Sequence, residues 1–550
     1  MRRVVRSLTI GVVSATVITG MVLPAGSAAA GAGRSAGHAT RSLSATRGLL
    51  RPARVVKRAA APMSRTSLTV SRRVPVRRST KASRAVSPPT AGSTPLAGPG
   101  GTLLENFDGV SSLDSAKTNF GAEFEPPDQG LCVGDGFVVE PVNSAFRIFR
   151  TNGTSAKGPR NVNALFNDGP KQYTSDPRCY FDPTTDTWFA VILYLNPAFT
   201  TSRIDLAVNT SGDPRTPWTT FHIDTTSGAF PGHKGCPCFG DQPLLGVDGF
   251  NVYISTNEFS ILGPQFNGAQ IYAVSKSDLV NARSTVHFVH FDNLSIGGAK
   301  AASIQPADTV GGAPAEFFLN ALDPFATFDD RIGVWAMTDR GAVSAGGTPT
   351  LSSAILSSEA YGIPPPTPQL GSTSTLDSDD DRMMQVESIG GELWGSLGTS
   401  VNIPNDIKAR AGCAWFRIQP RLAGNVIGDP TMLAQGYVAR QGNSLIYPSV
   451  AVNRNGDAVM VMTISSARRF PSVAYTLMRA GESAFGSLTV AEAGTGPYDP
   501  KATRWGDYSA ASLDKSGAFW LATEYIPPVS SQTLDGKRNW GTRLLEVDPG

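Results

Sequence analysis

The chain has 550 residues, and its 48 Lys and Arg against 45 Asp and Glu give a formal net charge of +3 at pH 7. Residues 1–100 contain 17 of the basic residues and no acidic one, so the other 450 residues carry 31 basic and 45 acidic residues, a net charge of −14. The basic stretch has no aromatic residues that could stack on bases, which argues against nucleic acid as a partner. The remaining length is too great for one small, simple domain.

Residues 1–30 have the pattern of a secretory signal peptide. Arg2, Arg3 and Arg6 give a basic start, residues 8–23 form a short apolar stretch, and residues 27–30 offer a small-residue cleavage site. No later segment is long and apolar enough to span a bilayer. We therefore predict a secreted, extracellular protein without a membrane span in its mature form.

Residues 31–100 are rich in Ala, Ser, Pro, Thr and Arg and show no periodic apolar pattern. Such a composition buries too little apolar surface to offset the entropy that is lost on ordering. We predict a disordered basic linker here, followed by a folded domain at 101–550. Two roles stay open for the linker: a solvated spacer, or electrostatic attachment to an anionic cell-wall polymer or surface.

The folded part shows period-two apolar runs separated by Gly, Pro, Asn and Asp, which is typical of many short strands. One strand–turn–strand pattern occurs twice without a gap, at 240–259 and at 506–525, and looser copies begin at Asp176 and Tyr447. Repetition at a spacing of roughly fifty residues indicates a β-propeller.

The repeats predict seven four-stranded units, at 127–168, 175–224, 240–292, 303–356, 379–440, 447–493 and from 505 onward. The last unit supplies only three strands, and the isolated strand at 103–107 would be its fourth, beside 543–547. This pairing of the chain ends would close the ring and remove exposed sheet edges. The predicted fold is therefore all-β: a seven-bladed propeller closed by an N-terminal strand and preceded by the signal peptide and the basic tail.

Particular turns carry a family resemblance. Ser211-Gly212-Asp213-Pro214-Arg215-Thr216-Pro217-Trp218 resembles the Asp-box turn (Ser-x-Asp-x-Gly-x-x-Trp) of sialidase-like propellers, with Arg215 in place of the glycine. The segments 504–508, 523–525 and 448–456 look like those of secreted bacterial propeller proteins of this superfamily, in a group without assigned activity. The resemblance covers roughly residues 120–550 and implies the architecture; the Asp box is a hairpin turn in that family and does not catalyse.

A ring of polar residues is expected at one mouth of the central channel, because each unit starts its innermost strand there. The residues just before those strands are Asp128, Asp176, Arg178, Asp241, Gln305, Asp381, Arg382, Tyr447, Arg504 and Asp507. Convergent polar groups in a concavity form the usual ligand site, and the three arginines could clamp a carboxylate. In the alternative interpretation, the aspartates bind backbone N–H groups of neighbouring units and pair with the arginines. The ligand-binding candidates are Asp176, Arg178, Asp241, Asp381, Arg382, Arg504 and Asp507.

Catalytic and metal sites are less clearly indicated. Glu258, Glu524 and Tyr525 lie at strand ends and could serve glycoside hydrolysis, which needs paired acidic groups or an activated tyrosine, but their repetition in two units favours a structural role. Asp377, Asp379 and Asp381 alternate as calcium ligands do. The glycine and the distal glutamate of an EF-hand loop are missing, so a solvated acidic loop is favoured. The sequence leaves the catalytic residues unknown, and we predict no cofactor, with calcium as the alternative.

The five cysteines of a secreted chain predict disulfides with one cysteine left over. Cys132 and Cys179 lie at aligned positions on the inner strands of adjacent units, so we predict that they pair. Cys236 and Cys238 are too near in sequence for an easy unstrained bridge, so one of them would pair with Cys413 or stay free.

Three functions remain open on the sequence. The first is binding of a carbohydrate or surface polymer at the channel mouth, and the second is an exo-acting glycoside hydrolase of sialidase type. The third is a structural extracellular scaffold. Three arginines converging beside a Tyr–Glu pair would favour the hydrolase, whereas arginines paired with aspartates would favour the binding protein. Five tryptophans could be sugar-stacking platforms or, as is more usual for strand aromatics, core residues between units: Trp188, Trp394, Trp415, Trp505 and Trp520.

Overall fold

The computed structural model describes residues 45–51, 86–98, 100–121, 124–226, 233–322, 328–498, 504–529, 532 and 539–550. All of them belong to one compact unit, Thr40–Gly550. The predicted signal peptide, residues 1–30, lies outside the described residues. None of the described helices has the length and hydrophobicity that a membrane span requires.

The described chain is all-β and consists mainly of four-stranded antiparallel sheets. The sheets of the first half are β3 (Cys132–Gly134), β4 (Phe137–Pro141), β5 (Ala145–Arg150) and β6 (Ser155–Asn161); β7 (Tyr173–Asp182), β8 (Thr187–Leu195), β9 (Ser202–Asn209) and β10 (Thr219–Asp224); β11 (Cys238–Val247), β12 (Asn251–Ser260), β13 (Phe266–Ser275) and β14 (Val286–Phe291); and β17 (Gln305–Val310), β18 (Glu316–Ala321), β19 (Asp329–Thr338) and β20 (Thr350–Tyr361).

The second half continues the pattern with β21 (Met383–Ile389), β22 (Glu392–Val401), β23 (Arg410–Gln419) and β26 (Thr431–Val438); β27 (Ser444–Val452), β28 (Ala458–Ser466), β29 (Arg469–Met478) and β30 (Thr489–Glu492); and β31 (Ala510–Leu513), β32 (Phe519–Tyr525), β33 (Gly541–Asp548) and β2 (Thr102–Ser111). In the described part of the chain, two short hairpins, two helices and two 3-10 turns lie between strands: β15 (Ser295–Ile296) with β16 (Ala299–Lys300), β24 (Leu422–Ala423) with β25 (Val426–Ile427), α1 (Ser112–Thr118), α2 (Lys276–Val280), η1 (Val162–Ala164) and η2 (Arg340–Ala342).

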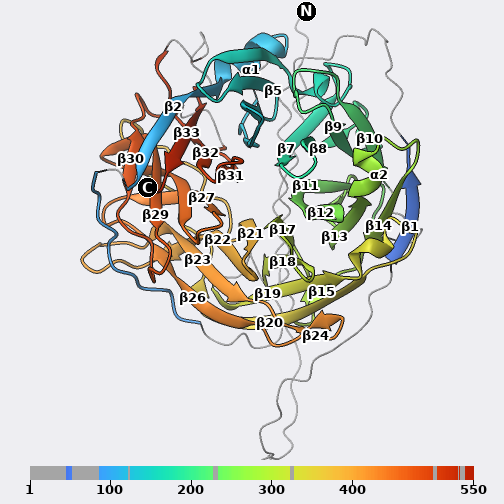
Figure 1. The fold of residues 1–550 in the computed structure, drawn as a ribbon. Coiled ribbons are helices and arrows are strands. Elements are labelled where there is room, and N and C mark those ends of the chain that lie inside the picture. The colour runs from blue at the N-terminus through green and yellow to red at the C-terminus, as the bar shows by residue number, and fades with distance from the viewer. Residues whose placement is uncertain are drawn as a thin grey trace, which may run out of the picture. The chain divides into compact units, whose positions relative to one another are not determined.

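The first strands of successive sheets touch one another in a closed circle, in the order β3, β7, β11, β17, β21, β27, β31 and back to β3. In Figure 1 the sheets radiate from this circle within residues 40–550. Strands β17 and β21 are close enough to pair in parallel, with Ala307 opposite Val386. This arrangement is that of a β-propeller, as the repeats predict.

The core lies between neighbouring sheets. Strand β8 reads TWFAVILYL and is buried along its whole length, because both faces of an inner strand pack against other sheets. One apolar cluster joins the β7–β10 sheet to the β11–β14 sheet, and another joins the latter to the β17–β20 sheet. The five tryptophans that could have stacked on sugars are buried in the core, with exposures of 3% or less: Trp188, Trp394, Trp415, Trp505 and Trp520.

The two ends of the propeller are paired. Strand β2 runs antiparallel to β33, with Leu103 opposite Val547 and Phe107 opposite Leu544, so it becomes the outer strand of the sheet that β31, β32 and β33 begin. Figure 1 shows β2 beside β33. The predicted closure by the strand at 103–107 is confirmed.

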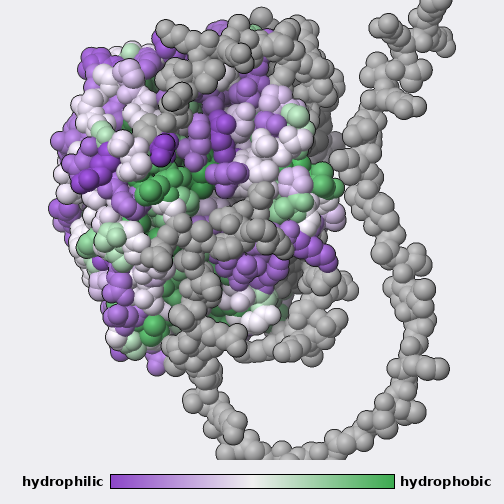
Figure 2. All heavy atoms as spheres, turned by 90° about the vertical axis from the view of Figure 1, so that its right-hand side faces the viewer, coloured by the Kyte–Doolittle hydropathy of each residue, from purple (hydrophilic) through white to green (hydrophobic). Residues whose placement is uncertain are grey.

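Two described segments of the predicted basic linker, residues 45–50 and 86–98, bond to the propeller, whereas disorder is predicted for 31–100. Strand β1 (Ala45–Leu50) pairs antiparallel with the outer strand β14. Farther along, Asn402 N donates to Pro89 O at 2.9 Å, and Leu488 N donates to Pro95 O at 2.8 Å. An outer strand offers unpaired backbone groups to any extended segment, so pairing with it does not need an apolar sequence. On the side where β14 and β1 lie, hydrophilic and apolar patches are interspersed on the visible surface (Figure 2).

The cysteine predictions are partly right. Cys132 and Cys179 form the predicted disulfide between β3 and β7, with Cα atoms 5.5 Å apart. Cys236 and Cys238 form a second disulfide with each other, so the prediction that they cannot easily pair is wrong. The chain turns immediately before β11 and brings their Cα atoms to 4.4 Å, at the short end of the range that permits a bridge. Cys413 is a buried free thiol and pairs with neither.

Candidate functional site

A left-handed residue stands at or just before the inner strand of one sheet after another. Non-glycine residues rarely adopt a positive φ, and here the same conformation recurs at equivalent positions: Asp128 (φ 48°), Asp176 (φ 60°), Gln242 (φ 49°), Ser303 (φ 46°), Asp379 (φ 51°) and Tyr447 (φ 56°). In β7, β11 and β27 the residue sits inside a register shift of the strand. Such bulges re-aim side chains beside functional sites.

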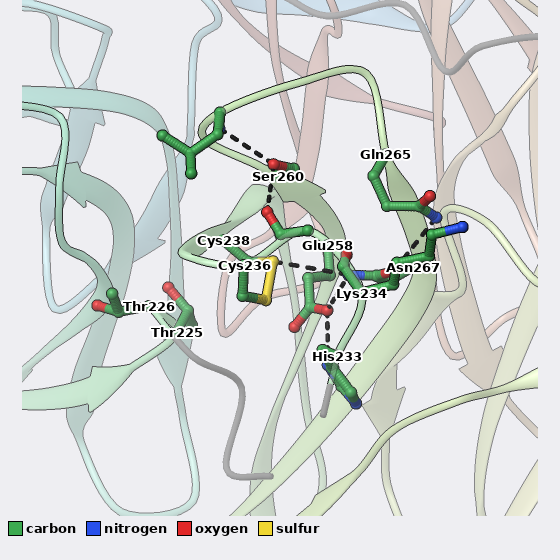
Figure 3. The surroundings of a disulfide bond; sticks show 12 residues. Thr225, Thr226, His233, Lys234, Cys236, Cys238, Glu258, Ser260, Gln265 and Asn267 are labelled. Carbon is green, nitrogen blue, oxygen red and sulfur yellow. Dashed lines mark hydrogen bonds and ion pairs between the residues drawn. A yellow bond between two sulfur atoms is a disulfide. The ribbon is translucent and has the colours of Figure 1, made fainter. Parts of the chain in front are cut away.

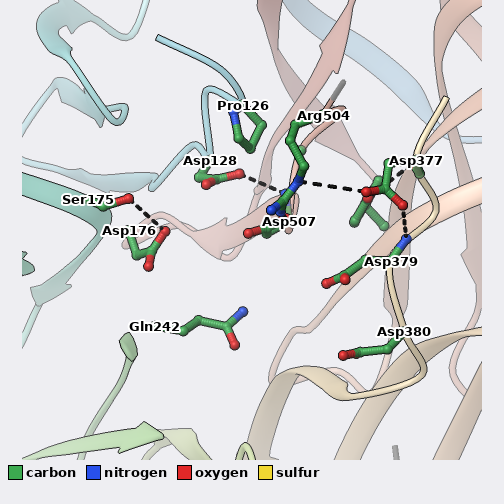
Figure 4. Close-up of polar contacts among 12 residues, drawn as sticks. Pro126, Asp128, Ser175, Asp176, Gln242, Asp377, Asp379, Asp380, Arg504 and Asp507 are labelled. Atoms are coloured by element: carbon green, nitrogen blue, oxygen red, sulfur yellow. Dashed lines mark hydrogen bonds and ion pairs between the residues drawn. The ribbon is translucent and has the colours of Figure 1, made fainter. Parts of the chain in front are cut away.

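This recurrent backbone brings polar side chains of distant segments around one region. Figure 4 draws Asp128, Asp176, Gln242, Asp377, Asp379, Asp380, Arg504 and Asp507 around it. We call these residues, with Arg178, Asp241 and Arg382, the mouth ring. These residues lie in or just before β3, β7, β11, β21 and β31, which all belong to the inner circle.

Three carboxylates form the acidic side of the mouth ring. Oxygen atoms of Asp128, Asp176 and Asp507 all lie within 4.8 Å of one another. Asn143 holds two of them, because its Nδ2 donates to Asp128 Oδ2 at 2.7 Å and its Oδ1 accepts from Asp176 N at 2.6 Å. Asp507 N donates to Asp128 Oδ1 at 2.7 Å. Oxygen ligands of this kind suit a hard divalent cation such as calcium.

Burial dominates the electrostatics of this group. It raises the pKa of Asp128 well above its usual value, and the Asp176 charge raises it further, while Arg504 acts in the opposite direction. Burial also raises the pKa of Asp176. The pKa of the neighbouring Asp241 rises to about 8, first through burial and then through Asp176. The acidic side therefore favours either bound protons or a bound cation over bare negative charge.

The three arginines of the mouth ring all have partners. Arg504 pairs with Asp507 and lies 3.7 Å from Asp377. Arg382 pairs with Asp380 at 2.6 Å and with Asp379 at 3.2 Å. The guanidinium of Arg178 lies 3.3 Å from the centre of the Tyr508 ring, in a cation–π contact.

Gln242 is one of the mouth-ring residues with a buried polar atom that makes no hydrogen bond among the described residues; Arg178 Nε, Asp379 Oδ2 and Arg504 Nε are others. The side-chain oxygen of Gln242 accepts a hydrogen bond from Arg382, which fixes the orientation of the amide. The residue is only 3% exposed, and its Nε2 has no hydrogen-bond partner among the described residues. A buried donor without an acceptor costs about 1–3 kcal/mol, so this amide is poised for an acceptor atom of a ligand.

The structure brings most of the sequence candidates together, but two are displaced from the places expected for them. At β11 the residue with the positive φ is Gln242, and Asp241 is the residue before it. In the loop before β21, Arg382 forms its ion pairs with Asp379 and Asp380. Asp381 is fully buried. Gln242, Asp380 and Asn143 were not predicted, because nothing local in the sequence reveals a positive φ or a side chain that bridges two sheets.

The catalytic and calcium candidates are scattered. Glu524 Oε2 accepts from Gly506 N at 2.8 Å, whereas the Tyr525 hydroxyl bonds to Asp108. Glu258 belongs to a separate cluster with His233, at 2.6 Å. In the acidic loop, Asp377 accepts from Asp379 N at 3.2 Å, and both carboxylates also face arginines of the mouth ring.

A separate surface pocket of about 420 Å³ is lined by Phe250, Pro314, Asp339, Arg340, Gly341 and Ala342. It contains none of the candidates that the sequence indicates. Arg340 stacks over Phe250 at 4.7 Å and pairs with the buried Asp248, so the polar group that lines it is already engaged.

No protein-family model matches this chain, and neither does any curated protein sequence. Three solved structures are distantly similar. Drosophila Plexin A in complex with Semaphorin 1b is 8% identical, with a TM-score of 0.35, over 83% of this chain and 88% of that one. The GH93 α-L-arabinofuranosidase of Fusarium graminearum with arabinobiose is 11% identical, with a TM-score of 0.34, over 80% and 98%. The NanB sialidase of Streptococcus pneumoniae is 8% identical, with a TM-score of 0.36, over 75% and 82%. Similarity at this level assigns no activity, so the functional argument rests on the mouth ring.

Proposed function

We propose that this protein is a secreted, seven-bladed β-propeller that binds a carbohydrate at the mouth ring. The blades would be the sheets that begin with β3, β7, β11, β17, β21, β27 and β31. Residues 1–30 would direct secretion, and the basic residues of 31–100 would attach the protein to an anionic cell-wall polymer.

The observation that carries the proposal is the unsatisfied Gln242 amide facing a group of carboxylates. A sugar hydroxyl both donates and accepts hydrogen bonds, so it can accept from Gln242 Nε2 and donate to an aspartate in the same site. Such a ligand would satisfy the buried groups without adding a charge. Fixed polar groups that converge in this way are typical of a small-molecule site.

The charge of the mouth ring favours an uncharged or basic sugar over an acidic one. Aspartates outnumber the arginines, and Arg382 and Arg504 are already ion-paired. An acidic sugar would have to displace those pairs, and it would add a negative charge beside Asp128 and Asp176, whose own ionisation burial already disfavours. This differs from the sialidase type of site, in which arginines must be available to a substrate carboxylate.

Isothermal titration calorimetry with the full chain tests the proposal. Neutral oligosaccharides, amino sugars and sialic acid would be titrated, each with calcium and with EDTA. We expect heat with a neutral or amino sugar and none with sialic acid. Gln242→Leu keeps the size of the side chain and removes its amide, so it should weaken binding by about tenfold, as expected for one lost hydrogen bond in a buried site.

Gln419→Leu is the matched control, because Gln419 bonds to Gly391 O at the end of β23, outside the mouth ring. It should bind as the unaltered protein does. Equal binding by Gln242→Leu, or tighter binding of sialic acid than of neutral sugars, would contradict the proposed site. Absence of heat with every sugar would favour the structural scaffold instead.

One observation favours glycoside hydrolysis as a second candidate. The Asp128 and Asp176 carboxyl groups have oxygen atoms within 4.8 Å of each other, and burial raises the pKa of both. Their interaction raises the pKa of Asp128 further and lowers that of Asp176, which separates the two pKa values as an acid–base pair requires. Aryl glycosides of the sugars that bind would be the substrates. If hydrolysis occurs, Asp128→Asn and Asp176→Asn should each abolish it, whereas Asp406→Asn, remote from the ring, should not.

A further inference from the structure

A second polar cluster surrounds the Cys236–Cys238 disulfide, at the start of β11 (Figure 3). His233 Nδ1 lies 2.6 Å from Glu258 Oε1, and His233 Nε2 lies 3.1 Å from Asp292 Oδ2. The side chains of these three residues are 7%, 2% and 8% exposed. They form a buried group of one imidazole between two carboxylates.

Both ring nitrogens of His233 face carboxyl groups, which holds the imidazole in one orientation. The Asn293 amide is farther from Nε2, at 3.4 Å. Hydrogen bonds from the imidazole partly compensate two carboxyl groups that are buried together.

Further hydrogen bonds hold Glu258 in place. Asn267 Nδ2 donates to its Oε1 at 2.8 Å, and Gln270 Nε2 donates to its Oε2. The Gln270 oxygen in turn accepts from Tyr272 OH at 2.9 Å and faces His290 Nε2 at 2.7 Å. The carboxylate that orients His233 is therefore fixed from both sides by residues of β13 and β14.

The sulfur atoms are set directly against this cluster. Cys236 Sγ, a His233 ring nitrogen and a Glu258 oxygen all lie within 4.8 Å of one another, and Cys236 is half-buried beside the exposed Lys234 and Gly235. Cys238 is fully buried, and its Sγ accepts a hydrogen bond from Asn267 Nδ2 at 3.6 Å. Cys236 is thus the more exposed of the two cysteines. Cys238 is buried beside the Asn267 amide, which can donate a hydrogen bond to its sulfur.

Chain stabilisation does not account for this disulfide. It joins residues only two positions apart, whereas Cys132 and Cys179 are 47 apart. The entropy that a disulfide removes from the unfolded chain grows with the length of the loop it closes, so the shorter bridge constrains little. A role in chemistry explains the surrounding charges better than a role in stability.

We propose that Cys236–Cys238 is a reversible redox site that exchanges electrons with a low-molecular-weight thiol. A thiolate of the reductant attacks Cys236 Sγ, the bond between the two cysteines breaks, and Cys238 leaves as a thiolate. A second thiolate then attacks the reductant's sulfur in the mixed disulfide, which releases the oxidised reductant and the Cys236 thiolate. The two thiols supply two electrons, and their protons pass to solvent or to the cysteines.

Hydrogen-bond donors beside the sulfur atoms favour the reduced state. A stabilised thiolate makes a disulfide easier to reduce. The Asn267 amide already donates to Cys238 Sγ and would stabilise the Cys238 thiolate. The His233 ring lies within 4.8 Å of Cys236 Sγ and would donate to the Cys236 thiolate, against the opposing effect of the Glu258 carboxyl beside it. His233 acts as a positioning residue and does not itself form a bond.

Redox titration of the folded full chain tests the proposal. The protein would be equilibrated with mixtures of reduced and oxidised glutathione, alkylated with N-ethylmaleimide, and analysed by peptide mass spectrometry, with near-UV circular dichroism to confirm that it stays folded. Cys132–Cys179 is the internal reference. We expect Cys236–Cys238 to be half-reduced at a glutathione ratio at least about tenfold less reducing than the reference needs. Reduction of both disulfides together, or resistance of Cys236–Cys238 until the protein unfolds, would overturn the proposal.

A pair of histidine variants tests the role of the cluster. His233→Gln keeps a hydrogen-bonding side chain but removes the imidazole beside Cys236 Sγ, so reduction by glutathione at pH 7 should slow by about tenfold. His287→Gln is the control, because His287 also pairs with an aspartate, Asp278 at 2.7 Å, away from the disulfide. Equal reduction rates in the two variants would overturn the part assigned to His233. The titration of the unaltered protein decides the redox proposal even if His233→Gln fails to fold.

Discussion

Buried carboxyl groups are a conspicuous feature of this molecule at the scale of single residues. Glu140, on β4, is fully buried, and its Oε2 accepts from Val110 N at 2.8 Å. Burial raises its pKa to about 7, although the hydrogen bonds from Thr542 and Val110 act in the opposite direction. Asp308 behaves in the same way, with a pKa of about 7. These groups hold a proton in the folded protein at a pH at which the unfolded chain has released it.

We therefore expect the stability of the protein to fall as the pH rises from about 4.5 to 7. In that window the folded state binds more protons than the unfolded state, so each unit of pH lowers the free energy of unfolding. Glu140→Gln removes one titrating group. Across this pH range the free energy of unfolding of the variant should therefore fall less than that of the unaltered protein, by about 3 kcal/mol at most, which corresponds to the pKa shift of Glu140. Melting temperatures at pH 5 and pH 7.5 measure this difference.

The control for that measurement is Glu482→Gln, which replaces an exposed glutamate in a turn. It should keep the pH dependence of the unaltered protein. An unchanged slope in Glu140→Gln would show that this carboxyl does not hold its proton in the folded state.

At the scale of elements, the propeller depends on links between sheets that are distant in sequence. The Cys132–Cys179 disulfide joins β3 to β7, and β1 pairs with the outer strand β14. Residues 86–98 bond to Asn402, Ala439 and Leu488, which directly flank β22, β26 and β30. The first link is covalent and closes a long loop. The others are backbone hydrogen bonds to sheets that are already complete.

The two disulfides should therefore contribute unequally to stability. Cys132→Ala with Cys179→Ala should lower the free energy of unfolding by about 4 kcal/mol, and Cys236→Ala with Cys238→Ala by less than about 2 kcal/mol, from the lengths of the loops they close. Urea denaturation of the two double variants measures both values. A larger loss from the second pair would mean that the short bridge is a structural link after all.

At the scale of the whole molecule, closure of the ring depends on one strand. The sheet formed by β31, β32 and β33 has its outer edge covered by β2, and the capping helix α1 follows directly. Without β2, an edge that includes Leu544 and Val547 would be unpaired and open to other chains.

Two truncations separate the roles of the N-terminal segments. A chain that starts at residue 86 loses β1 but keeps β2, and it should melt within a few degrees of the full chain, since β1 covers only an outer edge. A chain that starts at residue 112 loses β2 and should aggregate or unfold over a broad range. Size-exclusion chromatography and thermal melts compare the two chains, both exported by the same leader. A monomeric, cooperatively melting shorter chain would contradict the conclusion that β2 is needed to close the propeller.

The sequence by itself determines the architecture, because strands, turns and repeats are local signals. The period-two runs, the repeated pattern at 240–259 and 506–525, and the orphan strand at 103–107 suffice to predict four-stranded units and the pairing of the chain ends. The aligned positions of Cys132 and Cys179 likewise predict their bond. Each of these inferences needs only short-range pattern and the rule that a sheet edge must be covered.

Only the tertiary structure decides which side chains meet. A positive φ at Gln242 sets its amide against Arg382, beside Asp241 in the mouth ring, and Asn143 joins Asp128 to Asp176 from the turn between β4 and β5. His233 and Asp292 are 59 residues apart in sequence and 3.1 Å apart at their polar atoms. Backbone angles at bulges and contacts across sheets arise from packing of the complete circle, so no local pattern encodes them. Local sequence patterns thus determine the propeller architecture. The sites are determined only by the folded propeller, because each site is made of residues from distant segments that meet when the circle of sheets closes.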